Sequence, residues 1–319
     1  QAAPGSSKRS GTASSRGAGG GVSSGANSAA ASTAMTPPKG MARLAVHPAA
    51  GGPKIRLGIL WFFLALAAVT AGRWPTAILW GVVASLASRE LVSLWWSADG
   101  DGAAGAGTSG GSKADRPQGA GTVQGSAPAA VTALVVVMTL AVPAAAALGT
   151  GFAGAVLMLV TVALAAVAIA SRVGTVGFTP AQASTLAIAV LLPAVPAAAV
   201  VIAVAGHLWA GLFLVLAVSL YDAGCYIGGA DSSSLLEGPV TGVVGVLAVT
   251  FTMAMFQAPP FDALSAAIVG MACAVACPVG QWVASAFLPS VDAPARALRR
   301  LDAYIVAAPV FVCAGWILT

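Results

Sequence analysis

Residues 183–204 read Ala-Ser-Thr-Leu-Ala-Ile-Ala-Val-Leu-Leu-Pro-Ala-Val-Pro-Ala-Ala-Ala-Val-Val-Ile-Ala-Val and carry no charged side chain. An α-helix needs about 20 mainly apolar residues to cross the roughly 30 Å hydrocarbon core of a bilayer, and this run is long enough. Its apolar residues are continuous rather than alternating, which argues against a membrane-spanning β-strand. The stretch therefore predicts a transmembrane helix.

The composition of the whole chain extends this prediction. Hydrophobic residues make up 58% of the 319 residues and charged residues only 8%, whereas a soluble domain carries about 25% charged residues. The net charge of +5 comes from basic residues scattered through tails and short loops. They lack the interleaved aromatic residues of a nucleic-acid-binding surface, so we expect an integral membrane protein that binds no nucleic acid.

Similar apolar runs recur along the chain and predict an all-α, polytopic integral membrane protein with about nine transmembrane helices. The first run is short and could tilt or lie shallow in the bilayer, and the eighth is long enough to break near Pro278. The expected spans are residues 57–71, 75–96, 129–148, 152–170, 183–204, 208–228, 238–256, 263–288 and 301–318.

The segments outside these spans divide the chain into four regions. Residues 1–53 are rich in Gly, Ala and Ser and have no periodic apolar face, which predicts a disordered cytosolic N-terminal tail. Residues 54–96 form an N-terminal transmembrane hairpin, and residues 97–127 form a flexible cytosolic linker. Residues 128–319 form the main transmembrane domain.

The positive-inside rule sets the expected orientation in a cell membrane. If the N-terminal tail is cytosolic and the spans alternate, most of the basic loop residues also fall on the cytosolic side, and Arg73 falls outside. The residues placed in the cytosol in this way are Lys113, Arg116, Arg172, Arg296, Arg299 and Arg300.

The chain has four cysteines, and each lies in an apolar context without neighbouring metal ligands: Cys225, Cys273, Cys277 and Cys313. We interpret them as small buried side chains rather than as disulfide or zinc ligands.

An acidic residue, Asp222, lies inside the sixth span. Insertion of an acid at this depth costs about 2.5–3.5 kcal/mol, so the residue needs a partner. It is either a carboxylate near a helix end that reaches the membrane interface, or a metal ligand or member of an ion pair. Gly224, Gly228 and Gly229 follow it and would allow either close approach to a phosphate or close helix packing.

A second polar group, Arg299, Arg300 and Asp302, precedes the last apolar run. A guanidinium group can bind two phosphate oxygens at once, although arginines at a span end also serve as topological anchors. Asp302 favours the first reading, because an acid at a helix N-terminus can share a metal ion with a phosphate.

These polar stretches resemble the phosphatidate cytidylyltransferase (CDP-diacylglycerol synthase) family. Arg300-Leu-Asp-Ala, followed by Ala307-Ala-Pro-Val-Phe311, is similar to the Asp-Arg-x-Asp signature that opens the final membrane helix of that family. Asp222-Ala-Gly-Cys-Tyr-Ile-Gly is similar to its Asp-x-Gly-x-Tyr-x-x-Gly stretch, and Glu237-Gly238 to the end of its Lys-Lys-x-x-Glu-Gly motif. The Arg89-Glu90 pair resembles an early polar position of the family.

The resemblance implies transfer of CMP from CTP to phosphatidic acid, which gives CDP-diacylglycerol and pyrophosphate with Mg²⁺ as cofactor. It implies metal-binding roles for Asp222 and Asp302, and catalytic roles for Glu237 and Arg300. It also implies substrate-binding roles for Arg299, Arg300, Ser233 and Ser234, of which the two serines stand in place of the paired lysines of the family. The implied partners are phosphatidic acid, CTP and the lipid bilayer, and a homodimer is a possible assembly.

The sequence departs from the family pattern at several positions. Gln281 and Ala284 stand in place of acids, and the loop before Arg300 has no His-Gly-Gly. A catalytically silent relative that binds lipid headgroups or a membrane partner is therefore the alternative to an active transferase. A small transporter is a third reading, which the lack of an evident inverted repeat disfavours.

Overall fold

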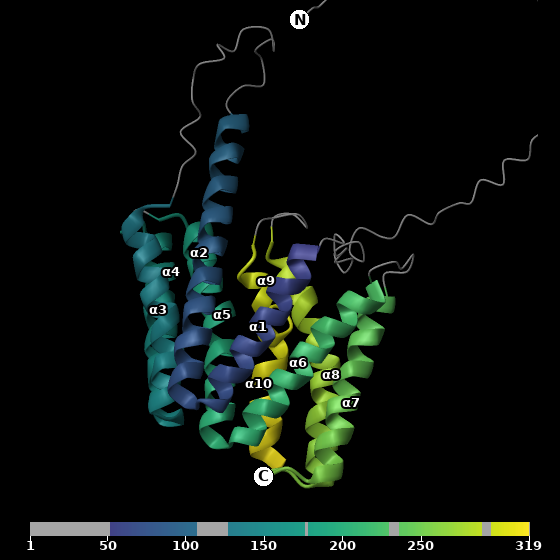
Figure 1. Cartoon of the computed structure of the whole chain (residues 1–319). Helices are drawn as coiled ribbons and strands as arrows, with labels where there is room; N and C mark the ends of the chain where they lie inside the picture. Colours follow the sequence, from purple (N-terminus) through teal and green to yellow (C-terminus); the bar gives the residue numbers. More distant parts are fainter. Residues whose placement is uncertain (1–51, 107–126, 176–177, 230–235, 289–294, 319) are drawn as a thin grey trace, which may run out of the picture. The chain divides into compact units, whose positions relative to one another are not determined.

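The computed structural model describes residues 52–106, 127–175, 178–229, 236–288 and 295–318 (Figure 1). Within these ranges the chain forms helices and no strand, which confirms the all-α prediction there. The helices are α1 (Gly52–Thr70), α2 (Arg73–Ala106), α3 (Ala129–Leu148), α4 (Thr150–Val173), α5 (Pro180–Gly206), α6 (Leu208–Gly229), α7 (Glu237–Phe256), α8 (Ala263–Ala286), α9 (Leu298–Leu301) and α10 (Tyr304–Leu318).

Eight helices in the described ranges are long and apolar enough to cross a membrane, so the chain is a multi-pass membrane protein. The prediction of about nine spans is corrected to eight, because the described apolar part of α1, Gly58–Thr70, is too short. The last span, Leu298–Leu318, combines α9 and α10. The eighth apolar run, which is long enough to break near Pro278, stays one helix, since α8 continues through Pro278.

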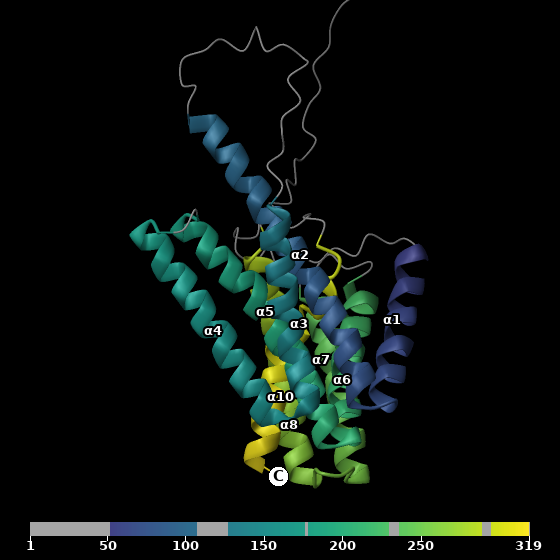
Figure 2. The ribbon, with the colours of Figure 1, turned by 90° about the vertical axis from the view of Figure 1, so that its left-hand side faces the viewer.

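The helices alternate in direction, so their described ends gather at two ends of the bundle (Figures 1 and 2). One end holds the start of α1, the end of α6, the start of α7, the end of α8 and the whole of α9; we call it the α9 end. The other end holds the α1–α2, α5–α6 and α7–α8 turns and the last residues of α10; we call it the α7–α8 end.

Helix α10 packs against α5, α6 and α8 and so lies at the centre of the C-terminal helices. Three phenylalanines join these elements near the α7–α8 turn: Phe213 of α6, Phe261 of the turn and Phe311 of α10. Their ring centroids lie 5.4–5.8 Å apart in edge-to-face contacts, a geometry that stabilises aromatic pairs beyond the area they bury. This packing fixes α10 relative to α6.

Small residues allow α6 and α7 to approach closely. A Cβ atom on Gly224 would lie 2.6 Å from the carbonyl oxygen of Thr241, and one on Gly242 would lie 2.7 Å from that of Tyr221. No larger side chain fits such contacts without moving backbone. Of the two readings of Gly224 that the sequence left open, helix packing is the one that these contacts support.

The four cysteines are free thiols in the structure. Cys273 and Cys277 are buried and Cys225 is partly buried. The expected burial of Cys313 is wrong, because its side chain points outward from α10 and is exposed.

Candidate functional site

The junction between α9 and α10 carries the basic and acidic residues that precede the last apolar run. Leu298 and Leu301 are fully buried and anchor α9 in the bundle, while the side chains of Arg299 and Arg300 are partly exposed. Asp302 follows in a turn and is only 7% exposed. Its carboxylate accepts a hydrogen bond of 2.7 Å from the backbone N–H of Ala303. The predicted start of the last span at residue 301 thus becomes a short helix, a turn and then α10.

Gly280 allows the turn at Asp302 and Ala303 to pack closely against α8. A Cβ atom on Gly280 would lie 2.5 Å from the carbonyl oxygen of Asp302 and 3.0 Å from that of Ala303. Real Cβ atoms do not come so close to backbone oxygens, so the junction can pack here only against glycine. The close contact sets the depth of Asp302 in the bundle.

Asp222 and Asp302 come from helices distant in the sequence but lie within electrostatic range of each other. Arg300 interacts with both carboxyl groups, and Arg299 also interacts with that of Asp302. We call Asp222, Arg299, Arg300 and Asp302 the polar cluster. Two acids face two guanidinium groups, so the formal charges of the cluster cancel, which makes their joint burial at the α9 end less costly.

Arg300 extends from the cluster toward α1. Its Nη1 atom lies 3.9 Å from the position that a Cβ atom would take on Gly58. The short helix α1 therefore borders the guanidinium group, although it is not among the eight candidate spans. Because a planar guanidinium offers several N–H donors, Arg300 can interact with the two carboxyl groups and still offer donors to a phosphate.

The other predicted site residues have different surroundings. Glu237 is the first residue of α7 and is exposed. Its backbone carbonyl accepts a hydrogen bond of 2.7 Å from the hydroxyl of Thr241. An exposed acid in the first turn of a helix is favourable without any ligand. Ser233 and Ser234 lie outside the described residues.

Among the described residues, no group of three or more His, Cys, Asp and Glu side chains could enclose a metal ion. The cluster offers two carboxylates, and Mg²⁺ is often held by one or two carboxylates together with substrate phosphates and water. The donor set of Asp222 and Asp302 therefore fits Mg²⁺ when a phosphate supplies further oxygens, and it does not form an all-protein metal cage.

Two residues beside the cluster were not assigned by sequence reasoning. The hydroxyl of Tyr221 donates a hydrogen bond of 3.0 Å to Oε1 of Gln281, the residue that stands in place of a family acid. Tyr304 is buried next to Trp80, and its hydroxyl has no hydrogen-bond partner among the described residues, although Ser219 approaches it. Neither tyrosine stands out in the sequence, because aromatic residues are common in apolar runs.

Glu90 was noted in the sequence only as part of a polar pair. Its Oε2 atom accepts hydrogen bonds from the backbone N–H groups of Ala297, at 2.8 Å, and Leu298, at 3.2 Å. Helix α2 thus contacts the start of α9 directly. No local motif around Ala297 could have signalled this contact, because the partners are 207 residues apart.

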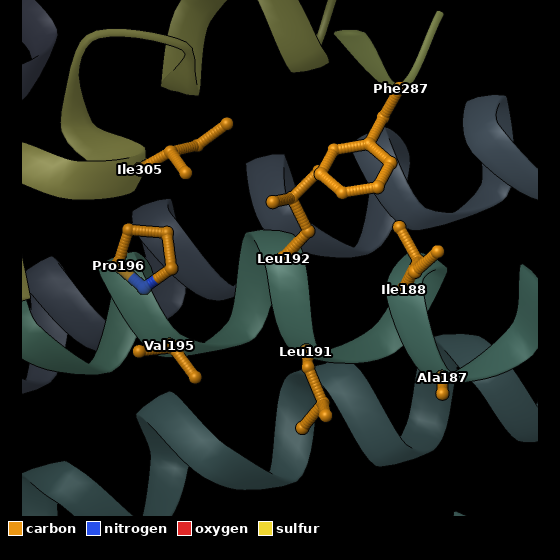
Figure 3. A pocket seen from close by; sticks show the side chains of 8 residues that line it. All are labelled: Ala187, Ile188, Leu191, Leu192, Val195, Pro196, Phe287 and Ile305. Carbon is orange, nitrogen blue, oxygen red and sulfur yellow. The ribbon is translucent and has the colours of Figure 1, made fainter. Parts of the chain in front are cut away.

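An apolar groove of about 330 Å³ runs along α5 and is also lined by Phe287, which follows α8, and by Ile305 of α10 (Figure 3). Figure 3 shows Phe287 next to Ile188 and Leu192, and Ile305 next to Pro196. Ile305 lies in the first turn of α10, three residues after Asp302. The groove therefore lies close in the chain to the polar cluster, because Ile305 lines the groove and Asp302 belongs to the cluster.

A scan against models of protein families, a search of curated proteins and a search of solved structures each found no match.

Proposed function

We propose that the protein is a divergent relative of the phosphatidate cytidylyltransferases and that it binds the phosphate of phosphatidic acid at the polar cluster. The observation that carries the proposal is the convergence of Asp222 of α6 with Arg300 and Asp302 of the α9–α10 junction. Acids buried in a membrane bundle are costly and mark ligand or ion sites by default. The two acids here lie beside the residue type that best binds phosphate.

The charge balance of the cluster favours such a ligand. Its two acids and two guanidinium groups cancel, and a doubly charged phosphate that enters with one Mg²⁺ leaves the sum unchanged. Asp222 and Asp302 would hold the cation, and Arg300 would donate to the phosphate oxygens. When bound, Mg²⁺ would neutralise the negative charge that a nucleotide and a lipid phosphate bring together.

The reaction that accompanies this proposal is CMP transfer. An oxygen of the phosphatidic acid phosphate forms a bond to the α-phosphorus of CTP, the bond from that phosphorus to the β-phosphate oxygen breaks, and pyrophosphate leaves. The residues of this chain contribute by position: Arg300 orients the lipid phosphate, and burial of the α9–α10 junction keeps water from competing with it.

The second candidate is a relative that binds the lipid phosphate without CMP transfer. It is favoured by the finding that two carboxylates converge in the described part of the chain, where no third His, Cys, Asp or Glu joins them, while Gln281 is hydrogen-bonded to Tyr221 and Glu237 lies exposed. A site of this composition suffices for a single bound phosphate, whereas transfer from CTP requires the charge of a triphosphate to be neutralised as well.

Incubation of the purified protein in nanodiscs with labelled CTP, phosphatidic acid and Mg²⁺ distinguishes the two candidates. Formation of CDP-diacylglycerol that is lost in Asp222→Asn supports the transferase, with Asp262→Asn as the control for loss of one carboxylate. Binding of phosphatidic acid without product supports the silent relative. If the wild-type protein neither binds phosphatidic acid nor turns over CTP, the proposal is wrong.

We further propose that the α9 end faces the cytosol of a cell membrane. Arg296, Arg299 and Arg300 lie at this end, as the positive-inside rule requires for a cytosolic face. Labelling of a single cysteine at position 296, in a variant without the native cysteines, tests this orientation. Modification by an impermeant maleimide in intact cells would place the α9 end outside the cytosol and contradict the proposal. Modification only after lysis would support a cytosolic α9 end.

A further inference from the structure

We propose that Glu90 of α2 is a positioning residue that fixes α9, and with it Arg299 and Arg300, in the geometry that the polar cluster requires. The expected effect of Glu90 on phosphatidic acid binding rests on the proposed function. The expected effect of Glu90 on the position of α9 does not. The starting observation is that one carboxylate oxygen of Glu90 accepts hydrogen bonds from the N–H groups of Ala297 and Leu298.

These two N–H groups have no acceptor within their own helix. The first N–H groups of any helix lack partners in the preceding turn, and side chains of the capping residue usually satisfy them. Residue 297 is an alanine, and α9 has no side-chain cap of its own. Glu90 thus supplies from another helix the acceptor that the local sequence lacks, with an ionised group whose hydrogen bonds are stronger than those of a neutral cap.

The Glu90 cap affects the polar cluster because it lies directly before Arg299 and Arg300 in the chain. Arg299 and Arg300 follow Leu298 directly, and their N–H groups continue the same turn by donating to the carbonyls of Ala295 and Ala297. A helix of four residues has too few internal hydrogen bonds to be stable alone. Its orientation therefore depends on tertiary contacts, and the Glu90 cap is one that engages its backbone.

A second contact from α2 strengthens this arrangement. The indole N–H of Trp95 donates a hydrogen bond of 3.0 Å to the carbonyl oxygen of Phe287, which directly follows α8. Helix α2 thereby contacts the chain just after α8, through Trp95, and just before α9, through Glu90.

The sequence offers a matched control. Arg89 is next to Glu90 on α2, carries a charge and is exposed. Substitution of either residue changes the net charge by one at nearly the same place. Faster amide exchange at Ala297 and Leu298 in Glu90→Ala that Arg89→Gln does not share is specific to the Glu90 carboxylate and does not follow from the loss of a charge at this place.

Hydrogen–deuterium exchange of the amides of Ala297 and Leu298 in nanodiscs tests the cap directly. We expect Glu90→Ala to speed their exchange by about tenfold or more, since the two lost hydrogen bonds have a charged acceptor. Glu90→Gln should restore much of the protection because its amide oxygen also accepts hydrogen bonds. Unchanged exchange in Glu90→Ala would overturn the inference, whatever the lipid result.

Binding of phosphatidic acid to the same variants tests the functional part. We expect Glu90→Ala to weaken binding by about tenfold, with partial rescue in Glu90→Gln and no change in Arg89→Gln. Faster exchange with unaltered binding would reduce Glu90 to a purely structural cap and so overturn the positioning role. If the wild-type protein does not bind phosphatidic acid, the proposed function fails, and the exchange of residues 297–303 alone decides whether Glu90 holds the segment.

Discussion

Two aspartates lie just before the helices α8 and α10, at opposite ends of the bundle, and their surroundings differ completely. Asp262, at the α7–α8 end, is exposed and forms a capping box with Ser265. Its carboxylate accepts hydrogen bonds from the Ser265 backbone N–H, at 2.7 Å, and from the Ser265 hydroxyl, at 2.6 Å. Asp302, at the α9 end, is buried and lies in electrostatic range of another acid and two arginines.

The difference shows that an acid before a helix is not by itself a functional signal. Local hydrogen bonds account fully for Asp262, because a carboxylate at an N-cap stabilises its helix. Asp302 has the hydrogen bond from Ala303 at 2.7 Å, but that bond does not explain why a second acid, Asp222, is placed nearby. The presence of a second acid, Asp222, and of Arg299 and Arg300 near the buried Asp302 is what makes the α9 end the candidate site.

The largest expected effect is that of Gly280→Ala, which would remove the burial that distinguishes Asp302 from Asp262. The added methyl group would meet the carbonyl oxygens of Asp302 and Ala303, and backbone cannot yield as a flexible side chain can. We expect destabilisation by about 1–3 kcal/mol, measured as a lower thermal unfolding temperature in nanodiscs.

The control for this substitution is Gly154→Ala, because a Cβ atom at Gly154 of α4 would have no neighbour within 4 Å. An unfolding temperature for Gly280→Ala equal to that of Gly154→Ala would show that the α9–α10 junction is not packed against α8 as described.

Arg300→Lys and Asp302→Asn are the next most damaging changes and test whether the buried acid is paired for a ligand. Lysine keeps the positive charge but loses the bidentate geometry, so we expect binding of phosphatidic acid to weaken by about tenfold. Asp302→Asn should lower the dependence of that binding on Mg²⁺. Vesicle binding with and without Mg²⁺ measures both effects.

Asp262→Asn provides the comparison for these variants at the other end of the bundle. Equal losses of binding in Asp302→Asn and Asp262→Asn would mean that the two ends do not differ in function. If Arg300→Lys retained phosphatidic acid binding, Arg300 would be interpreted as a topological anchor and not as a phosphate-binding residue.

Leu192→Trp is expected to have a smaller effect, through the apolar groove that borders the α9–α10 junction. The larger side chain would fill space beside Phe287 and exclude one or two methylene groups of a lipid chain, each worth about 0.8 kcal/mol. We expect weaker binding of phosphatidic acid and unchanged binding of glycerol 3-phosphate, which has no acyl chain.

Ile268→Trp is the control for this change, since Ile268 lies on α8 nearer the α7–α8 end and is 43% exposed. If both tryptophan variants weaken phosphatidic acid binding equally, the groove has no special relation to the cluster.

The smallest expected effect is that of Asp262→Asn on stability. Hydrogen bonds from Ser265 lower the pKa of Asp262 below its ordinary value, so the ionised carboxylate stabilises the folded protein above the pKa that it has when unfolded. Asparagine can still cap the helix, and it removes only the charge.

The difference in unfolding temperature between the wild-type protein and Asp262→Asn should therefore be constant near neutral pH. It should shrink as the pH falls below about 4, because Asp262 becomes protonated through its lowered pKa. A difference that grew toward low pH would contradict the local explanation of Asp262.

The helices could largely be predicted, because in a bilayer the length of each apolar run determines whether it forms a membrane-spanning helix. Backbone polar groups in hydrocarbon must be satisfied within the segment, so each sufficiently long apolar run becomes a helix. Run length decided the helices, and the one error in the count arose at α1, whose apolar part is short. The choice of Asp222, Arg299, Arg300 and Asp302 as candidates also came from the sequence, because charges are conspicuous in such runs.

The tertiary structure alone decided which of these residues meet. Gly280 allows the turn that carries Asp302 to pack closely against α8, and this turn lies near Asp222 of α6, while Glu237 is exposed at the start of α7. The contact of Glu90 with α9 joins residues 207 positions apart. The apolar pattern of the sequence indicates only which residues can be buried. Which residues then contact each other depends on helix packing and on which acceptors lie near the unpaired N–H groups at helix starts.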